Sequence, residues 1–237
     1  MTQSPADDAP RRVLILDFDG VVVNTEEVHF ESWREAFRQQ LGVRLPGDYT
    51  QVVGLTLDEL FEMWRPLAPV PLTIDLRRRL LAAKTDLFFT VGEGRFKPIS
   101  GVADLVRDAQ RQGWYAAIAS RGRRLRLLRT LELARVPAVF ELILALEDAV
   151  DPKTDRKVHA RAAWALGAEP AACVVVEDSL SGIADALDSG IGRVIGLTTS
   201  FDATALRQAG AHEVISRLDE VRLPSLAVPY GNNGGGA

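Results

Sequence analysis

The sequence predicts an α/β fold: a parallel sheet with helices on both faces and a block of helices inserted after the first strand. Four aliphatic residues in a row at positions 13–16, flanked by charge, are typical of a strand buried on both faces. From about residue 97 onward, predicted helices and strands alternate strictly, which indicates parallel strands joined by helical crossovers. Between these parts, about 70 residues carry helical patterns and no convincing strand.

The inserted block is expected to begin with a helix that runs to about residue 41. Its apolar residues recur every three or four positions and form one stripe: Phe30, Trp33, Phe37 and Leu41. Thr25 is expected to cap this helix and Gly42 to end it. The tryptophans and phenylalanines of the block are expected to form its core. Two further helices are expected at 57–64 and 74–89.

The alternating part is expected to contain strands at 114–119, 142–145, 173–176, 193–197 and 213–215, and helices at 102–112, 123–134, 155–166, 179–189 and 203–209. Because crossover connections are usually much shorter than the inserted block, we predict that the block is a domain of its own. The predicted division is a core at residues 1–23 and 97–230, a helical domain at 24–96, and a flexible tail at 231–237.

Composition limits the possible partners and compartments. The net charge is −4, with 47% hydrophobic and 25% charged residues, so we expect neither nucleic acid nor a membrane as a partner. No secretory signal is visible in residues 1–12, and no apolar run is long enough to span a bilayer. The single cysteine, Cys173, lies in an apolar run and is expected in the core. We therefore expect a cytoplasmic protein, and a monomer.

Polar residues follow the predicted strands, at the edge where open parallel sheets bind their ligands. Asp17 and Asp19 come first and share one face of an extended segment, while Gly20 permits a turn. Two carboxylates so close repel each other unless a cation or a proton lies between them. The later strands are followed by Ser120-Arg121-Gly122, by a loop with Asp151-Pro152-Lys153, and by Glu177-Asp178-Ser179.

These residue types suit phosphoryl transfer with a hard metal ion. Carboxylates such as Asp17 and Asp178, with a backbone carbonyl near Asp19, are the oxygen ligands that Mg²⁺ prefers. A carboxylate can also attack phosphorus and form an aspartyl phosphate. The hydroxyl and backbone N–H groups at Ser120 and the ammonium of Lys153 could then hold the phosphoryl oxygens.

In this order the motifs resemble those of the haloacid dehalogenase superfamily: Asp17-Phe18-Asp19-Gly20-Val21, Ser120, Lys153 and Glu177-Asp178. The resemblance runs from about residue 13 to about residue 215. The stretch 24–33, and Glu177-Asp178-Ser179 with Gly182 after it, look closest to the β-phosphoglucomutase-like branch. The resemblance implies a Rossmann-like core with a small helical cap domain.

The resemblance also implies roles for individual residues. Asp17 would be the nucleophile, and Asp19 would protonate the leaving oxygen and later activate water. Ser120 and Lys153 would bind the phosphoryl group. Asp178 would hold Mg²⁺ together with Asp17 and Asp19, with Glu177 as a direct or water-mediated helper. Lys157 competes with Lys153 because the prolines that follow the family's lysine are absent, although the spacing back from Gly167 favours Lys153.

Residues outside the four motifs are expected to contact the substrate. Basic residues at a helix N-terminus oppose the helix dipole, so Arg121, and also Arg123, are expected to meet a second anionic group. The remaining arginines of that run, Arg124, Arg126 and Arg129, are expected at the surface, as are His159 and His212. In the inserted block, the resemblance implies substrate contacts from His29 and from the loop that contains Gly54 and Thr56, and Lys84 could contact the substrate in place of the arginine expected of mutases.

We therefore expect a Mg²⁺-dependent phosphatase that acts on a small phosphorylated metabolite, such as a sugar phosphate, through an aspartyl phosphate. A hexose phosphomutase is the alternative, but the arginine expected of such mutases next to Thr56 is Leu57 here. The presence of Asp19 places dehalogenase and phosphonatase activity behind phosphate-ester chemistry. A non-catalytic phospho-acceptor module, similar to a response-regulator receiver, is a third and more remote hypothesis.

Overall fold

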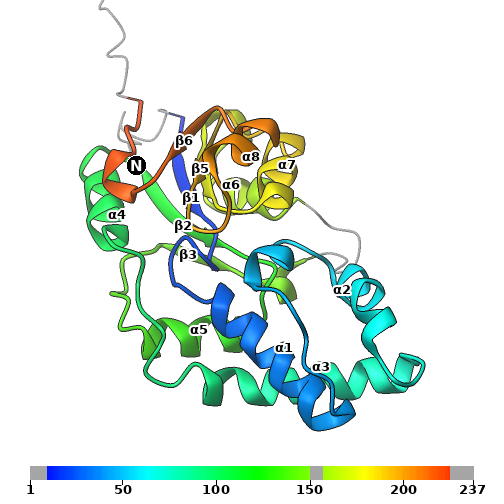
Figure 1. The fold of residues 1–237 in the computed structure, drawn as a ribbon. Coiled ribbons are helices and arrows are strands. Elements are labelled where there is room, and N and C mark those ends of the chain that lie inside the picture. The colour runs from blue at the N-terminus through cyan, green and yellow to red at the C-terminus, as the bar shows by residue number, and fades with distance from the viewer. Residues whose placement is uncertain (1–9, 150–156, 225–237) are drawn as a thin grey trace, which may run out of the picture.

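The centre of the molecule is a sheet of six parallel strands in the order β3-β2-β1-β4-β5-β6 (Figure 1). The computed structural model describes residues 10–149 and 157–224. The strands are β1 (Val13–Leu16), β2 (Tyr115–Ala119), β3 (Leu142–Leu144), β4 (Val174–Glu177), β5 (Arg193–Leu197) and β6 (Glu213–Ile215). Each lies within one residue of its predicted bounds, and the α/β parallel-sheet fold is confirmed.

Both faces of the sheet are buried, as its continuous apolar strands require. Leu14 and Leu16 of β1 face a cluster that includes side chains of α4 (Val102–Arg111) and α5 (Arg124–Leu133). Val13 and Ile15 face the opposite cluster, which is completed by α6 (Val158–Ala165), α7 (Leu180–Asp188) and α8 (Ala203–Gln208). All four residues of β1 are fully buried, so this strand is the axis of the core. Cys173 is buried as expected.

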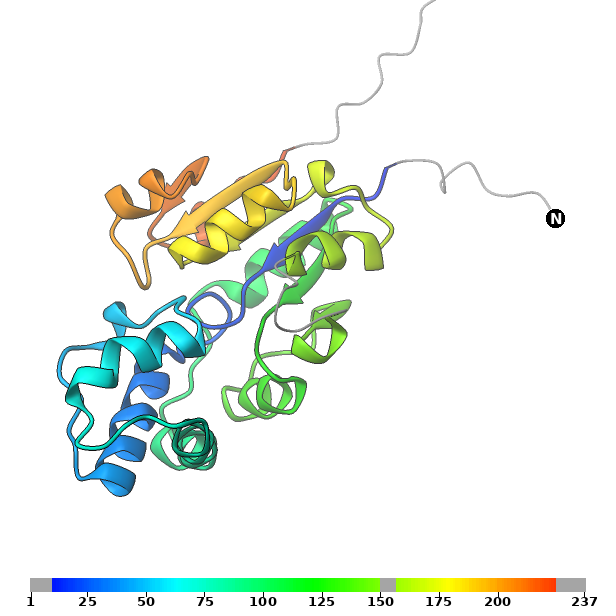
Figure 2. The same cartoon turned by 90° about the vertical axis from the view of Figure 1, so that its right-hand side faces the viewer.

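Three helices are inserted between β1 and β2: α1 (Glu26–Leu41), α2 (Leu57–Trp64) and α3 (Ile74–Val91). They lie beyond the carboxyl end of β1 (Figure 2). A third hydrophobic cluster lies entirely within this helical insertion and includes Trp33, Phe37, Phe61 and Trp64. For these residues the prediction of an aromatic core is confirmed, with the ring centroids of Trp33 and Trp64 5.5 Å apart. It is wrong for Phe88 and Phe96, which pack into the cluster on one face of the sheet. The domain bounds at 23/24 and 96/97 stay a prediction.

The chain leaves and re-enters the sheet at neighbouring points. Asn24 donates its backbone N–H to the carbonyl of Lys97 at 3.1 Å, and its side-chain oxygen accepts the N–H of Lys97 at 2.6 Å. Val23 forms an antiparallel bridge to Pro98. The two connections between the sheet and the insertion are therefore hydrogen-bonded to each other.

Two expectations about the first helix have different outcomes. Gly42 ends α1, with a φ of 68° and its N–H donated to the carbonyl of Arg38. The expected cap at Thr25 is wrong: its hydroxyl makes no hydrogen bond to the helix and instead donates to Oδ1 of Asp19. A capping hydroxyl would accept a backbone N–H from a residue with extended backbone, whereas Thr25 has φ −113° and ψ −16° and its hydroxyl donates to the carboxylate.

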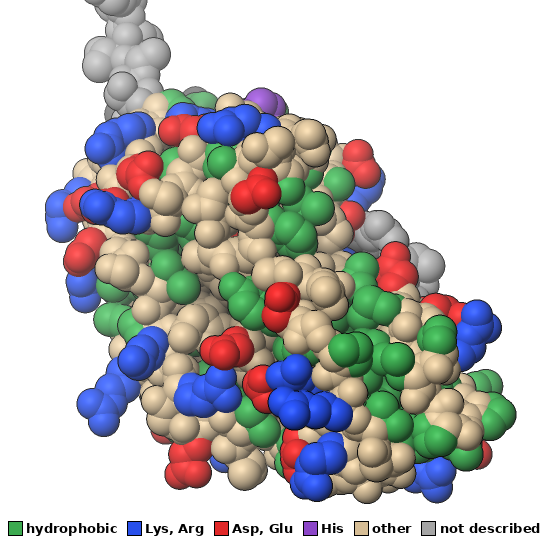
Figure 3. All heavy atoms as spheres, viewed as in Figure 1, with side chains coloured by type: hydrophobic (Ala, Val, Ile, Leu, Met, Phe, Trp, Pro, Cys, Tyr) green, Lys and Arg blue, Asp and Glu red, His purple; other side chains and the backbone are tan. Residues whose placement is uncertain are grey.

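No helix among the described residues is long and apolar enough to cross a membrane. On the face shown in Figure 3, basic and acidic side chains are intermixed.

Candidate active site

A cavity of about 630 Å³ lies between the carboxyl ends of the strands and the helical insertion. The strand ends contribute Asp17, Ser120 and Asp178, while the insertion contributes His29 and Lys84. The cavity therefore contains groups that lie more than 100 residues apart in the sequence, as expected for the ligand-binding edge of an open parallel sheet.

Three acids converge in this cavity. Asp17 follows β1, while Glu177 and Asp178 stand at the end of β4, the strand paired with β1. Each offers one carboxylate oxygen, and these oxygens all lie within 4.8 Å of one another. Oδ2 of Asp178 accepts the hydroxyls of Thr199, at 3.2 Å, and of Ser200. These two hydrogen bonds orient the carboxylate of Asp178 and stabilise its ionised form, which burial disfavours.

Burial and neighbouring negative charges disfavour the ionised forms of Asp17 and Asp178. Burial, followed by the charges of Glu177, Asp19 and Asp178, raises the pKa of Asp17 well above its ordinary value. Burial and the charge of Glu177 raise the pKa of Asp178 to about 8. A buried cluster of oxygen ligands that disfavours its own negative charge is the donor set that suits a hard divalent cation.

Gly20 is required by the close approach of the two strand ends. Its φ is +76°, and a Cβ atom there would lie 1.9 Å from Oδ2 of Asp178. A side chain at this position would therefore be strained and would displace a member of the acid cluster. The prediction that Gly20 permits the turn is confirmed.

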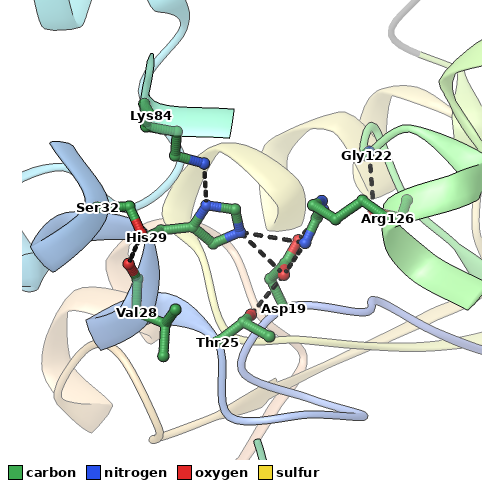
Figure 4. A network of polar contacts seen from close by, with 9 residues as sticks. Asp19, Thr25, Val28, His29, Ser32, Lys84, Gly122 and Arg126 are labelled. Atoms are coloured by element: carbon green, nitrogen blue, oxygen red, sulfur yellow. Dashed lines mark hydrogen bonds and ion pairs between the residues drawn. The ribbon is translucent and has the colours of Figure 1, made fainter. Parts of the chain in front are cut away.

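Asp19 lies apart from the acid cluster, in a network of cations and hydroxyls (Figure 4). Both oxygens of its carboxylate accept hydrogen bonds from the Arg126 guanidinium, each at 2.7 Å. Oδ1 also accepts the hydroxyl of Thr25 and lies 3.3 Å from Nε2 of His29. Burial alone would raise the pKa of Asp19, but the charge of Arg126 and the hydrogen bonds hold it well below its ordinary value.

The network continues into the helical insertion (Figure 4). The amine of Lys84, on α3, lies 2.6 Å from Nδ1 of His29, on α1. Burial, followed by the charge of Lys84, lowers the pKa of His29 to about 3, so the imidazole is neutral at pH 7. Burial and the charge of Arg126 lower the pKa of Lys84 to about 7. A contiguous polar chain therefore joins Lys84, His29, Asp19 and Arg126 across the cavity.

Comparison with known proteins decides the family. The sequence model of the haloacid dehalogenase-like hydrolases matches residues 14–195. The chain belongs to the haloacid dehalogenase-like hydrolase family. The resemblance inferred from the strand-end motifs is thereby confirmed, and the chain is a hydrolase.

Two proteins of similar sequence and one solved structure illustrate what this hydrolase is similar to. It is 30% identical over 193 residues to Protein CbbY of Rhodobacter capsulatus, covering 78% of this chain and 84% of that protein. It is 24% identical over 217 residues to the phosphorylated carbohydrates phosphatase of Thermotoga maritima, covering 88% and 98%. A crystal structure of a haloacid dehalogenase family hydrolase from Deinococcus radiodurans, with bound phosphate and sodium, has a TM-score of 0.65 and 27% identity, covering 91% of this chain and 95% of that chain.

The other expected site residues of this hydrolase differ in how they are placed in the cavity and in what they contact. Ser120 is buried at the end of β2 and lines the cavity, where its Oγ accepts the N–H of Gly122 at 3.0 Å. Arg121 also lines it, but its guanidinium lies 3.6 Å from Asp185 and 3.3 Å from Ser181. The carboxylate of Asp19 lies outside the three-acid group, so its expected contribution to the metal site depends on the backbone carbonyl.

The expected substrate loop of the insertion also reaches the cavity. Gly54 and Thr56 both line it. The carbonyl of Gly54 accepts the hydroxyl of Ser181 at 3.0 Å, which joins the loop to the core. Thr56 caps α2 through a reciprocal pair of hydrogen bonds with Glu59. The expectation for Lys153 lies outside the described residues, whereas Lys157 is the exposed residue that precedes α6.

Two residues expected at the surface lie in the cavity wall instead. Arg126 is not at the surface: its side chain is only 17% exposed and pairs with Asp19. His159 is only 1% exposed, lines the cavity and lies 3.5 Å from Oε1 of Glu177. The basic residues at this helix N-terminus oppose the helix dipole, which indicated that the helix end is functional. Nothing in the sequence of the arginine run, however, marks Arg126 as the member that faces the cavity.

Proposed function

We propose that this hydrolase is a Mg²⁺-dependent phosphatase that releases phosphate from a small phosphorylated metabolite, in particular a sugar phosphate. The observation that carries the proposal is the group of Asp17, Glu177 and Asp178, which lies at the strand ends inside a cavity large enough for a small metabolite. The substrate class is supported by the relative named as a phosphorylated carbohydrates phosphatase, which matches over 98% of its length.

The donor set of the cavity fits Mg²⁺. All three acids offer carboxylate oxygens, which are the ligands that hard cations prefer. The raised pKa values of Asp17 and Asp178 reflect negative charge that a cation would relieve. Asp17, Asp178 and the backbone carbonyl of Asp19 would hold the ion, with Glu177 as a direct or water-mediated helper. When bound, Mg²⁺ would neutralise negative charge between the attacking carboxylate and the phosphoryl oxygens.

The residues of the chain then divide the reaction into two displacements. A carboxylate oxygen of Asp17 attacks phosphorus, the bond from phosphorus to the ester oxygen breaks, and Asp19 donates a proton to that leaving oxygen. A water molecule next attacks the aspartyl phosphate while Asp19 takes its proton, which regenerates Asp17 and releases inorganic phosphate. Ser120 would hold a phosphoryl oxygen, and Lys153 is expected to hold another.

The helical insertion would select the substrate. The strand-end groups interact with any phosphoryl group, so discrimination must come from the part of the cavity that contacts the leaving group. His29, Gly54, Thr56 and Lys84 lie in that wall. We propose that the insertion is a cap that opens and closes over the cavity, with the paired connections at Asn24 and Lys97 as its hinge.

The test is a screen of phosphorylated metabolites for phosphate release with Mg²⁺ and with EDTA. We expect release that requires the metal and is lost in Asp17→Asn, with Asp188→Asn, at the exposed end of α7, as the matched control. A phosphomutase would instead interconvert phosphosugar isomers faster than it releases phosphate. If purified protein hydrolyses no phosphate ester with metal present, the phosphatase proposal is wrong and a phospho-acceptor role becomes the better account.

A further inference from the structure

The pairing of Arg126 with Asp19 conflicts with the proton transfer proposed for Asp19. Arg126 lies on α5 of the core, and its guanidinium carbon lies 5.6 Å from the ring centroids of both Phe18 and Phe88. Two parallel N–H groups of the guanidinium hold the two carboxylate oxygens of Asp19 (Figure 4). This is the bidentate geometry in which arginine binds a carboxylate most strongly.

Asp19 cannot serve a substrate while this pair is closed. Oδ2 accepts from Arg126, and Oδ1 accepts from Arg126 and Thr25 and lies beside His29. To protonate a leaving oxygen, one of these two atoms must instead carry a proton and face the substrate. The Arg126–Asp19 pair must therefore open during the reaction.

An opened pair leaves a guanidinium that needs another anion. Arginine stays charged in proteins, and the side chain of Arg126 is only 17% exposed. A buried charge without a counter-ion is strongly unfavourable. The group would therefore move to a new anionic partner within the cavity rather than remain unpaired.

The acids that line the described cavity are poor candidates for that partner. Asp17, Glu177 and Asp178 form the proposed metal site, and Asp185 lies 3.6 Å from the guanidinium of Arg121. Glu26 is the last acid of this wall, and burial, followed by the charges of Asp19 and Asp178, raises its pKa well above its ordinary value, which favours the uncharged form. Among residues 10–149 and 157–224, no acid besides these and Asp19 lines the cavity, so we take the incoming substrate as the source of the negative charge.

We propose that Arg126 exchanges Asp19 for a second anionic group of the substrate, a carboxylate or a phosphate carried by the leaving group. Binding of that group frees Asp19 to protonate the leaving oxygen. The hydrolase then favours phosphate esters with a second anionic group over matched esters without one, because only the former replace the counter-ion of Arg126. The planar guanidinium binds carboxylate and phosphate in the same bidentate way. This inference rests on the proposed phosphatase activity.

The test compares esters that differ only in the second anion: 3-phosphoglycerate with glycerol 3-phosphate, and glucose 1,6-bisphosphate with glucose 6-phosphate. In the wild type we expect kcat/KM to be at least about tenfold higher, in at least one pair, for the ester that carries the second anionic group. An added charged bidentate contact provides a gain of this size. Arg126→Gln should bring that ratio close to one. Arg126→Lys, which keeps the charge but loses the bidentate fork, should give an intermediate ratio.

The matched control is Arg129→Gln on the same helix. Arg129 is exposed and its guanidinium carbon lies 4.1 Å from the ring centroid of Phe89; this variant should keep the wild-type ratio. A ratio is unaffected by partial unfolding, and Arg126→Lys covers the case in which Arg126→Gln does not fold. Wild-type ratios near one for both pairs, or equal losses on both esters in Arg126→Gln, would overturn the exchange while leaving the phosphatase intact. No hydrolysis of any ester would instead refute the phosphatase.

Discussion

Replacing Asp178 by asparagine should stabilise the metal-free protein at neutral pH, although it removes a proposed metal ligand. Asp178 is 1% exposed, and burial followed by the charge of Glu177 raises its pKa from 3.8 to about 8. The folded state therefore binds this proton more tightly than the unfolded chain does. It follows that the free energy of unfolding falls as the pH rises through the window between these two pKa values.

The size of the effect follows from the width of that window. Each pH unit is worth about 1.4 kcal/mol, so the roughly three units below pH 7 cost the fold on the order of 4 kcal/mol. Asparagine does not ionise and keeps an oxygen for the hydroxyls of Thr199 and Ser200. We expect Asp178→Asn to raise the free energy of unfolding by about 2–4 kcal/mol at pH 7, and by less than half of that at pH 5.

The assay is urea denaturation in EDTA at pH 5, 6 and 7. Asp188→Asn, at the exposed end of α7, is the control and should change the free energy of unfolding by no more than about 0.5 kcal/mol. Added Mg²⁺ should stabilise the wild type and have a smaller effect on Asp178→Asn, because the ion binds the folded site. A gain that does not depend on pH, or a loss at pH 7, would refute the electrostatic reasoning.

Three further changes test other parts of the structure. Leu80 is fully buried in the hydrophobic cluster of the helical insertion. Leu80→Ala should therefore lower the free energy of unfolding by about 2–5 kcal/mol. A loss below about 1 kcal/mol in urea denaturation would contradict this packing. Within residues 10–149 and 157–224, neither buried ring nitrogen of His159 has a hydrogen-bond partner, and Nε2 lies 3.5 Å from Oε1 of Glu177. His159→Phe should therefore raise the free energy of unfolding by about 1 kcal/mol. A thermal scan that shows destabilisation would argue that the contact with Glu177 stabilises the fold. The pKa of Lys84 is about 7, so its ammonium is present below this pH and lost above it. KM for a sugar phosphate should therefore rise between pH 6 and 8 in the wild type, and rise less in Lys84→Arg. Equal rises in the two proteins would exclude Lys84 as a substrate contact.

The sequence alone determined the elements of the fold and the strand-end motifs. An aliphatic run shows that β1 is buried on both faces, and an aromatic stripe shows that α1 has one buried face. Gly20 and Gly42 mark turns that need a positive φ. These features depend on a few neighbouring residues, and the order of parallel strand ends then brings Asp17 and Asp178 to one place without further information.

Only the tertiary structure decided how the side chains pair in the cavity. Arg126 and Asp19 lie 107 residues apart, and an arginine run has the same composition whether one member faces a cavity or all face solvent. The hydroxyl of Thr25 could bond either a helix end or a carboxylate, and only the fold brings Asp19 close enough to take it. His159 is likewise buried by the contacts of α6 with the sheet rather than by its neighbours in the sequence. Local patterns specify which residues are apolar or charged, whereas the packing of helices against the sheet determines which charges meet.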